Sequence, residues 1–216
     1  VAVVEVVKSA LDTNVFGKVL DLGCSVGRST FELAKCSDQV DGIDFTARNI
    51  QHALALKEGT PVRFATQQEG EIVDFHEVTL AELGFEQAAE RIHFCQGDAH
   101  NLKPQFSDYD LILCSQLIEH LYSPKQFIKS IHQRLNKGGV LAVVSAYQWD
   151  TQVTQSENWL GGYKVNGENV TGRDGLQLLL GSNFELVGER QIASAQWQNS
   201  RKFEVELCEL TLWKLK

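Results

Sequence analysis

Short apolar runs alternate with segments of helical periodicity along most of the chain. Five runs of strand length stand out, at residues 18–23, 39–44, 91–99, 109–115 and 140–147. Helices are predicted between them, at residues 27–35, at 47–59, and at 123–139 with a glycine stop. This alternation is typical of an α/β fold, in which a doubly wound, mostly parallel sheet carries helices on both faces.

The last part of the chain departs from that alternation. Residues 184–191 and 202–215 are predicted to form a pair of antiparallel strands. In the second segment, Phe203, Val205 and Leu207 alternate with glutamates. With the five earlier runs, they predict a seven-stranded sheet closed by an antiparallel strand.

Two connections are longer than such a sheet needs. Residues 61–78 predict an inserted hairpin whose turn is the QQEG sequence at residues 67–70. Residues 146–175 are rich in Trp, Tyr, Asn and Gly, and we expect them to form a lid over a substrate. We expect one domain over residues 1–216.

Composition narrows the function. The formal net charge of −8 disfavours nucleic acid and anionic membranes as partners, and no run reaches the length of a membrane span. The five scattered cysteines predict neither disulfides nor a metal site, so we expect a cytoplasmic protein without metal. The absence of Met at position 1 leads us to expect a chain trimmed at its start or cut from a longer protein.

The turn after the first run, VLDLGCSVGRST, favours one kind of cofactor. Ser25 and Arg28 stand where a dinucleotide fingerprint needs its second and third glycines, and no Walker A lysine follows. The acidic side chain of Asp21 at the strand end would repel phosphate and attract an ammonium or sulfonium group. A cationic cofactor without phosphate is therefore predicted.

Two further acids follow the second and third runs. Asp44 is placed to accept hydrogen bonds from ribose hydroxyls, and Asp98 to accept one from the adenine amine. Any one of these acids could simply be a solvated carboxylate in a loop. Asp21, Asp44 and Asp98 together, at the ends of three successive strands, predict S-adenosylmethionine. The expected cofactor-binding set is Asp21, Gly23, Ser25, Gly27, Arg28, Asp44, Phe45, Asp98, Ala99 and Ser115.

These motifs make the sequence resemble the class I S-adenosylmethionine-dependent methyltransferases, which have a Rossmann-like sheet. A narrower resemblance is to the 4-mercaptohistidine N1-methyltransferases of ovothiol biosynthesis, carried by DLGCSVGRSTFELA, FATQQEGEIVDFHEV, QGDAHNLKPQFSDYDLIL, LIEHLYSP, YQWDTQVTQSENWLGG and SRKFE. It implies methyl transfer to a ring nitrogen of 5-thiohistidine, giving ovothiol A. It also implies fusion to, or pairing with, an iron-dependent sulfoxide synthase.

The sequence departs from this narrower family in two places. Glu119-His120 stands where an Asp-Arg pair is expected, and residues 191–200 ahead of Arg201 are unusual. A variant acceptor, such as the selenium analogue of thiohistidine, is therefore an alternative.

Catalysis by such an enzyme needs a neutral imidazole held in line with the methyl group. We expect Glu119 and His120 to direct the ring proton, and Tyr147 to line the site where the two substrates meet. The expected substrate-binding set is Gln116, Tyr147, Trp149, Trp159, Arg201 and Lys202, with the two cations facing a carboxylate. These side chains also have structural alternatives. Glu119 and His120 could start a surface helix, and Gln116 could cap the turn that follows its strand. The aromatic residues could pack in the core, and Arg201 and Lys202 could be solvated charges at a sheet edge.

Other functions stay open from the sequence. They are a methyltransferase for another small metabolite such as a carboxylic acid or quinone, and a non-catalytic domain that binds S-adenosylmethionine. A tRNA methyltransferase conflicts with the acidic charge.

Overall fold

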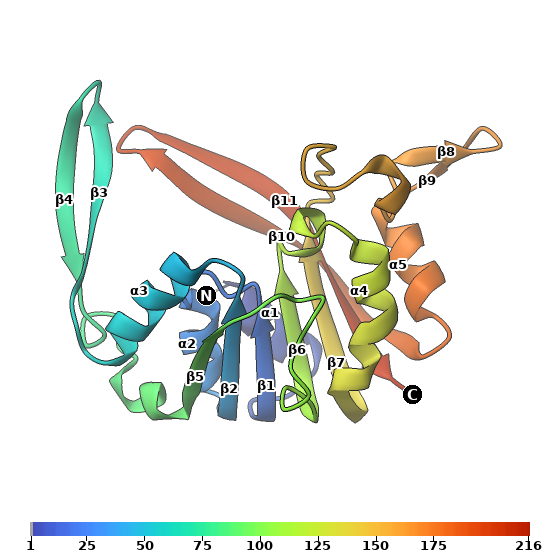
Figure 1. The fold of residues 1–216 in the computed structure, drawn as a ribbon, viewed down its shortest axis with the longest axis horizontal. Coiled ribbons are helices and arrows are strands. Elements are labelled where there is room, and N and C mark those ends of the chain that lie inside the picture. Colours follow the sequence, from blue (N-terminus) through green and yellow to red (C-terminus); the bar gives the residue numbers. More distant parts are fainter. Residues whose placement is uncertain (1) are drawn as a thin grey trace.

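A seven-stranded sheet in the order β10-β11-β7-β6-β1-β2-β5 runs through the molecule (Figure 1). The computed structural model describes residues 2–216. The sheet strands are β1 (Phe16–Leu22), β2 (Ser37–Asp44), β5 (Ile92–Gln96), β6 (Tyr109–Ser115), β7 (Leu135–Ser145), β10 (Phe184–Asn199) and β11 (Lys202–Leu215). Strand β11 runs antiparallel to both of its neighbours, and the other pairings are parallel. The predicted seven-stranded, doubly wound sheet with an antiparallel strand is confirmed.

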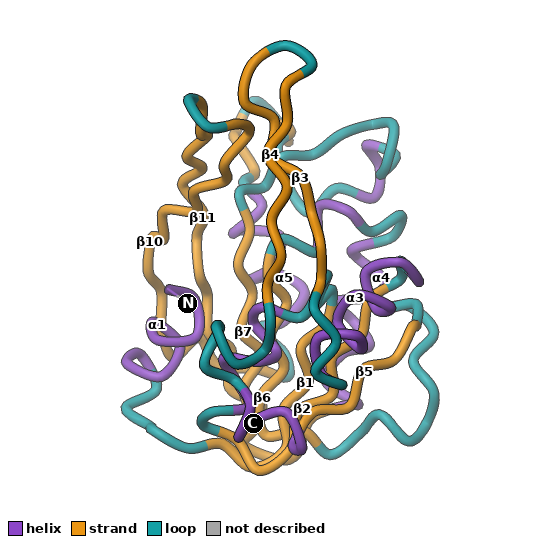
Figure 2. The backbone as a smooth tube through the Cα atoms, turned by 90° about the vertical axis from the view of Figure 1, so that its left-hand side faces the viewer, coloured by secondary structure: helices purple, strands orange, loops and turns teal. Residues whose placement is uncertain are grey.

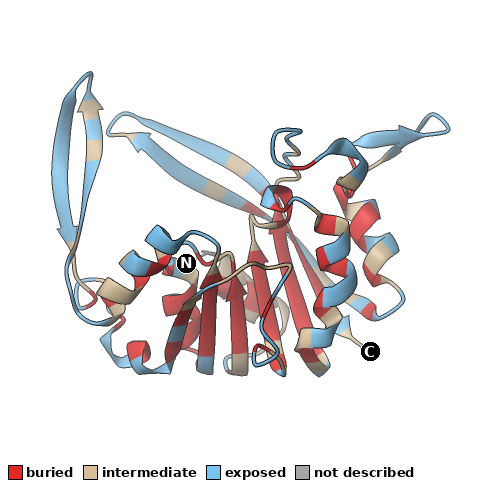
Figure 3. Cartoon of the chain, viewed as in Figure 1, coloured by how far each residue is buried: buried red, intermediate tan, exposed pale blue. Residues whose placement is uncertain are grey.

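Alternate residues of the central strands pack against opposite helix layers, as the pleat of a strand requires. In β6, Leu111 and Leu113 join the core beneath one layer, while Ile112 and Cys114 join the core beneath the other. The first layer contains α1 (Ala2–Ala10), α2 (Arg28–Ala34), α3 (Ala47–Lys57) and the 3₁₀ helix η1 (Glu86–Arg91). The second contains α4 (Pro124–Ser130) and α5 (Gly172–Leu180). Figure 3 shows the result, a sheet buried through its centre.

None of the helices within residues 2–216 is long and apolar enough to cross a lipid bilayer.

Two hairpins extend beyond the sheet and meet near their tips (Figures 1 and 2). One is the predicted insert, β3 (Val62–Glu69) with β4 (Ile72–Val78), and the other is the distal half of β10 and β11. The backbone N–H of Ser200 donates to the carbonyl of Gln67 at 3.2 Å. The turn of the insert lies at Gly70, which has φ 56°, and Glu71, so the prediction of a turn over residues 67–70 placed it too early.

The predicted helix at residues 123–139 is shorter than its periodicity suggested. Helix α4 ends at Ser130, a 3₁₀ turn, η3 (Ile131–Arg134), follows, and β7 already begins at Leu135. A Cβ on Gly139 would lie 2.9 Å from the carbonyl oxygens of Asn136 and Tyr109. Gly139 thus permits the close approach of β7 to β6 and does not serve as a helix stop.

The expected lid, residues 146–175, is more regular than predicted. It contains the 3₁₀ turn η4 (Ser156–Asn158) and a hairpin of β8 (Tyr163–Val165) and β9 (Glu168–Val170). Asn166 and Gly167 connect the two strands with φ of 52° and 88°, the positive values that a type I′ turn requires. The segment then enters α5 through a capping box of Thr171 and Asp174.

The lid segment is pressed directly against α5. A Cβ on Gly175 would lie 1.9 Å from the carbonyl oxygen of Leu160, and a Cβ on Gly161 would lie 2.0 Å from the carbonyl carbon of Thr171. Two backbones that approach this closely leave no room for side chains between them.

Replacing Gly175 with alanine is therefore expected to destabilise the fold although alanine is the better helix former. The intrinsic preference favours alanine by about 1 kcal/mol, while the overpacking costs about 1–3 kcal/mol and displaces backbone, not a mobile side chain. We expect a net loss in the free energy of unfolding measured in urea. Leu178→Ala in the same helix, where the side chain is 83% exposed, is the control. Equal stability of Gly175→Ala and wild type would contradict the packing described here.

Candidate functional site

A cavity of about 710 Å³ opens at the carboxyl ends of β1, β2, β5 and β6. This is the edge where open α/β sheets bind their ligands. The cavity is lined by Leu22, Gly23, Ser25, Ile43, Asp44, Phe45, Thr46, Gly97, Asp98, Ala99, His100, Ser115, Gln116, Leu117, His120, Leu121, Tyr122 and Val153. We call it the donor cavity.

The turn after β1 forms one wall of the donor cavity. Gly23 has φ 79° and its N–H donates to the carbonyl of Ile43 at 2.8 Å. A Cβ there would lie 3.0 Å from a methyl carbon of Leu117. Ser25 has φ 51°, and its N–H donates to Asp44 Oδ2 at 2.8 Å. The turn therefore keeps its backbone close to the end of β2.

Two carboxylates face the cavity with unused acceptor capacity. Asp44 Oδ1 accepts from the N–H of Thr46 at 2.8 Å and from the amide of Asn49 at 3.4 Å, whereas Oδ2 accepts only from Ser25 and retains a lone pair. Asp98 Oδ1 accepts from the N–H of His100 at 2.9 Å. The His100 ring stacks on Tyr122 with 3.9 Å between the ring centroids and faces the carbonyl of Ser123 through Nε2, at 3.1 Å. Both carboxylates are thus held in place while their free lone pairs remain open to a ligand.

The structure places most of the predicted cofactor-binding residues around this cavity. Those that line it are Gly23, Ser25, Asp44, Phe45, Asp98, Ala99 and Ser115. Asp21, Gly27 and Arg28 do not. Arg28 pairs with Glu32 at 2.8 Å, and its guanidinium lies 5.3 Å from the centre of the Phe85 ring, contacts that stabilise α2.

Asp21 lies beneath the turn, with only 1% of its surface exposed. Its Oδ2 accepts from the hydroxyls of Ser29 at 2.7 Å and Thr30 at 2.6 Å. Burial raises the pKa of Asp21 to about 6, although the two hydroxyls oppose the shift. The side chain anchors the first turn of α2, and a ligand in the cavity does not reach it directly.

Gln116, directly after β6, lines one side of the cavity, which we call the acceptor side. Gln116 has φ 50°, a strained value for this residue type. Its Nε2 donates to Glu206 Oε2 at 2.9 Å and to Cys208 Sγ at 3.5 Å, and both partners belong to β11. Gln148 Nε2 donates to the other oxygen of Glu206 at 3.2 Å. The contacts with β11 therefore fix the orientation of the Gln116 amide.

The predicted catalytic residues Glu119 and His120 both lie in the 3₁₀ turn η2 (Ile118–His120), which points their side chains to different places. His120 is exposed and lines the donor cavity. Glu119 is 4% exposed, and its Oε1 accepts from the N–H of Ala146 at 3.2 Å. Its Oε2 is buried without a hydrogen-bond partner.

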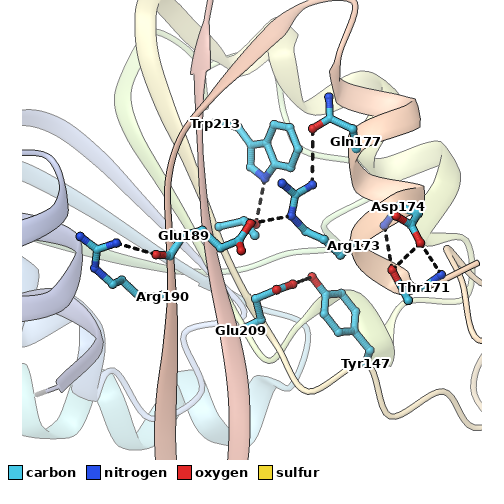
Figure 4. A network of polar contacts seen from close by, with 10 residues as sticks. Tyr147, Thr171, Arg173, Asp174, Gln177, Glu189, Arg190, Glu209 and Trp213 are labelled. Carbon is cyan, nitrogen blue, oxygen red and sulfur yellow. Dashed lines mark hydrogen bonds and ion pairs between the residues drawn. The ribbon is translucent and has the colours of Figure 1, made fainter.

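Tyr147 and Trp149 line a second cavity, of about 430 Å³, beside the start of α5. The Tyr147 hydroxyl donates to Glu209 Oε2 at 2.7 Å, within the polar network of Figure 4. Burial and this carboxylate raise the pKa of Tyr147, so the phenol stays protonated. Trp159 stacks on Trp149, with 6.4 Å between ring centroids, and donates from Nε1 to the carbonyl of Thr154 at 2.9 Å. These aromatics support the lid and do not line the donor cavity.

The structure does not bring Arg201 and Lys202 to either cavity. Both lie at the tip of the β10–β11 hairpin, where Arg201 lies 4.0 Å from Glu69 and Lys202 pairs with Glu204 at 3.1 Å. The two strands continue well beyond the sheet before they turn (Figure 1), so neither cavity supports their predicted role as partners of a substrate carboxylate.

Several residues of the site were missed from the sequence. His100 and Tyr122 line the donor cavity, and Glu206 and Gln148 hold Gln116. A histidine directly after QGDA and a tyrosine within LIEHLYSP were available as local signals. Nothing local indicates Glu206, since only the pairing of β11 with β7 brings it to Gln116.

No group of three His, Cys, Asp or Glu side chains within residues 2–216 is arranged to hold a metal ion.

Comparison with known families gives one match along most of the chain. A family model described as a methyltransferase domain matches residues 3–186. Among curated proteins, the ubiquinone biosynthesis O-methyltransferase of Histophilus somni (strain 2336) is 27% identical over 124 residues, which are 57% of this chain and 42% of that protein. The Idiomarina loihiensis protein of the same name is 25% identical over 158 residues, 73% of this chain and 51% of that protein. The chain thus spans about half the length of these relatives.

Solved structures share the fold. N-methyltransferase NodS from Bradyrhizobium japonicum WM9, in complex with S-adenosylhomocysteine, superposes with a TM-score of 0.62 at 17% identity, over 99% of this chain and 85% of that one. A structure titled for the conversion of a disulfide bond into a thioacetal group during echinomycin biosynthesis gives a TM-score of 0.64 at 15% identity, over 100% of this chain and 80% of that one.

The buried Asp21 makes stability depend on pH in a defined direction. Its pKa rises from an ordinary 3.8 to about 6 on folding, so the folded state binds the proton more tightly. Its stabilising contribution is complete below pH 3.8 and is lost as pH rises through about 6. The loss amounts to about 3 kcal/mol.

This contribution is measured as the difference in unfolding free energy between wild type and Asp21→Asn at pH 4 and at pH 7. We expect the wild type to lose about 2 kcal/mol relative to the variant between these two values, because part of the contribution is already lost at pH 4. Asp38→Asn, at the exposed start of β2, should show no such change. A pH-independent difference for Asp21→Asn would mean that folding does not raise the pKa of Asp21.

Proposed function

The chain belongs to the methyltransferase-domain family, and from this premise we propose that its acceptor is a ring nitrogen of 5-thiohistidine, as in ovothiol formation. The protein is a methyltransferase whose methyl donor is S-adenosylmethionine. The proposed acceptor implies that an iron-dependent sulfoxide synthase, fused or separate, supplies the substrate.

The donor cavity fits S-adenosylmethionine, which when bound supplies a methyl group on a sulfonium sulfur. Its volume of about 710 Å³ lies in the range of small-molecule sites. Asp44 would accept hydrogen bonds from the ribose hydroxyls, and Asp98 from the adenine amine. The absence of side chains at Gly23 and Gly97 is needed, because a Cβ at either would lie 3.0 Å from a neighbouring side chain. The acidic lining suits a cation and not a phosphate.

The observation that carries the acceptor proposal is the fixed amide of Gln116. Both of its N–H groups point to β11, to Glu206 and Cys208, and within residues 2–216 no donor reaches its carbonyl oxygen. That oxygen is therefore available to accept the N–H of a neutral imidazole. The proton is then held on one ring nitrogen, and the other presents its lone pair to the methyl group.

The remaining residues would assist by position and charge. His120, Leu121 and Val153 line the wall beside Gln116 and exclude water. As the new N–C bond forms, positive charge develops on the imidazole ring. Glu206 accepts from the Gln116 amide, and Glu119 accepts from the N–H of Ala146 at the end of β7. Both carboxylates would stabilise that charge electrostatically.

A second candidate is O-methylation of a quinol, which is the chemistry named for the curated relatives. One feature of the structure favours it. The distal half of the β10–β11 hairpin exposes apolar side chains that would suit an apolar tail, namely Trp197, Phe203, Val205 and Leu207.

Removing the Asp44 carboxylate is expected to weaken the binding of S-adenosylhomocysteine, the reaction product. Two hydrogen bonds to a charged acceptor would be lost, together with the bond that holds Ser25. We expect at least about a tenfold rise in Kd for Asp44→Ala by isothermal titration calorimetry. Asp38→Ala on the same strand is the control. Unchanged affinity in a folded Asp44→Ala protein would remove Asp44 from the site.

Product analysis separates the acceptors. Purified protein with S-adenosylmethionine is incubated with 5-thiohistidine, its selenium analogue, histidine, or a catechol-type quinol, and products are identified by mass spectrometry. We expect N-methylated thiohistidine, with little methylhistidine and little O-methylated quinol. Gln116→Ala should lower kcat by at least about tenfold without weakening S-adenosylhomocysteine binding. O-methylated quinol as the main product would overturn the proposal in favour of the second candidate.

A further inference from the structure

His100 lies in the wall of the donor cavity, between the end of β5 and the segment that leads into α4. Its side chain is only 3% exposed. The ring stacks on Tyr122, with 3.9 Å between ring centroids, and meets the ring of Phe127 edge-on at 6.3 Å. These two aromatic rings hold the imidazole in one orientation.

Both ring nitrogens of His100 face oxygen atoms that can only accept a hydrogen bond. Nδ1 lies 3.3 Å from Asp98 Oδ1, and Nε2 lies 3.1 Å from the carbonyl oxygen of Ser123. A neutral imidazole carries one N–H, so in that form one nitrogen would present its lone pair to an oxygen lone pair. The imidazolium donates to both oxygens, and the geometry therefore favours the doubly protonated ring.

The contact with Asp98 leaves one carboxylate oxygen for a ligand. Oδ1 accepts from the backbone N–H of His100 at 2.9 Å as well as from the ring. Within residues 2–216, Oδ2 has no hydrogen-bond partner, and Asp98 lines the donor cavity. His100 thus fixes the carboxylate through Oδ1 while Oδ2 stays open.

The contact with Ser123 holds a second wall of the cavity. We call residues 121–123 the strap, of which Leu121 and Tyr122 line the donor cavity. Its three successive carbonyls accept from Thr154 at 2.6 Å, Asn158 at 3.4 Å and His100 at 3.1 Å. The first two donors belong to the lid segment, so His100 is the one that joins the strap to the adenine end of the cavity.

Few other groups can influence the protonation of this ring. Of the residues that these contacts join to His100, Asp98 and Tyr122 are the titratable ones. The remaining titratable side chains that line the cavity are Asp44 and His120. The carboxylate of Asp98 stabilises a positive charge on the ring.

We propose that His100 is a positioning residue that acts as an imidazolium, holding Asp98 for the adenine amine of the methyl donor and the strap beside it. When the ring loses its second proton, one of its two bonds is lost and either Asp98 or the strap is released. The donor therefore binds more tightly to the protonated form, and its binding takes up a proton. The inference rests on the proposed role of Asp98 toward adenine and does not depend on the methyl acceptor.

The test measures the binding of S-adenosylhomocysteine without any acceptor. Its Kd is determined by calorimetry from about pH 5.5 to 8.5, the range in which histidine titrates. We expect the wild-type Kd to rise at least about fivefold with pH, since a charge-assisted bond is lost. Calorimetry in buffers of different ionisation enthalpy should show proton uptake by the wild type near neutral pH.

Two variants at position 100 assign the effect. In His100→Asn the side-chain amide can still donate to Asp98, and in His100→Gln it can still donate to Ser123, but neither side chain titrates. We expect the Kd of each variant to change by less than about twofold over the same range, and the Asn variant to bind more tightly than the Gln variant. Asp21, whose pKa is about 6, titrates in all of these proteins and does not distinguish them.

Two further histidines serve as comparisons. His93 also faces an aspartate, Asp41, at 3.2 Å, but it does not line the donor cavity. His93→Asn is therefore the matched control and should keep the wild-type profile. His120→Gln should keep it as well.

The outcomes separate this inference from the proposed acceptor. A wild-type Kd that is constant over this range, or a pH dependence that survives in both His100 variants, would overturn it. A dependence lost in His120→Gln and kept in His100→Asn would assign the titration to His120 and would also overturn it. Unchanged affinity in a folded Asp98→Asn protein would reject the role of Asp98 toward adenine and this inference with it. Failure to methylate 5-thiohistidine would reject only the acceptor.

Discussion

The hydrogen bond from the Ser25 backbone to the Asp44 carboxylate is the contact on which the donor cavity depends. It joins the turn after β1 to the end of β2 at 2.8 Å, and it accounts for the positive φ of Ser25. Beneath it, Asp21 anchors the first turn of α2 through two hydroxyls. Asp44 therefore faces the ligand, whereas Asp21 holds the helix, although both residues lie near the carboxyl ends of strands in the same sheet.

The acceptor side depends on a different constraint, the register of β11 against β7. Glu209 lies opposite Ser145, so the strand carries Cys208 and Glu206 past the end of β7 to the side chain of Gln116. The residues joined there are 90 and 92 positions apart in sequence. A shift of one residue would turn Glu206 to the opposite face and replace it with an apolar side chain.

These two constraints explain what the sequence could predict. The strands and the acids at their ends are local features, so Asp44 and Asp98 were found from the runs that they close. The NG turn at Asn166-Gly167 was equally local but was overlooked. Helix α1 was not predicted either. By contrast, the roles of Glu206, Arg201 and Tyr147 depend on how far β10 and β11 extend and where they turn. Alternation gives the faces of a strand but neither its partner nor its register.

The charges of the two halves of the site agree with one chemistry. Methyl transfer from a sulfonium to a neutral nitrogen moves a positive charge from the donor cavity to the acceptor side without creating a new one. Asp44 and Asp98 line the donor cavity, whereas Glu206 accepts from the Gln116 amide and Glu119 from the N–H of Ala146, and neither glutamate lines the cavity. In the proposed reaction, carboxylates in these positions would stabilise the positive charge before and after the transfer. For a phenolate acceptor the same glutamates would oppose ionisation of the nucleophile. The proposed nitrogen acceptor agrees with the charge of β11, whereas Trp197 and Phe203, two of the exposed apolar side chains of the same hairpin, lie near its tip.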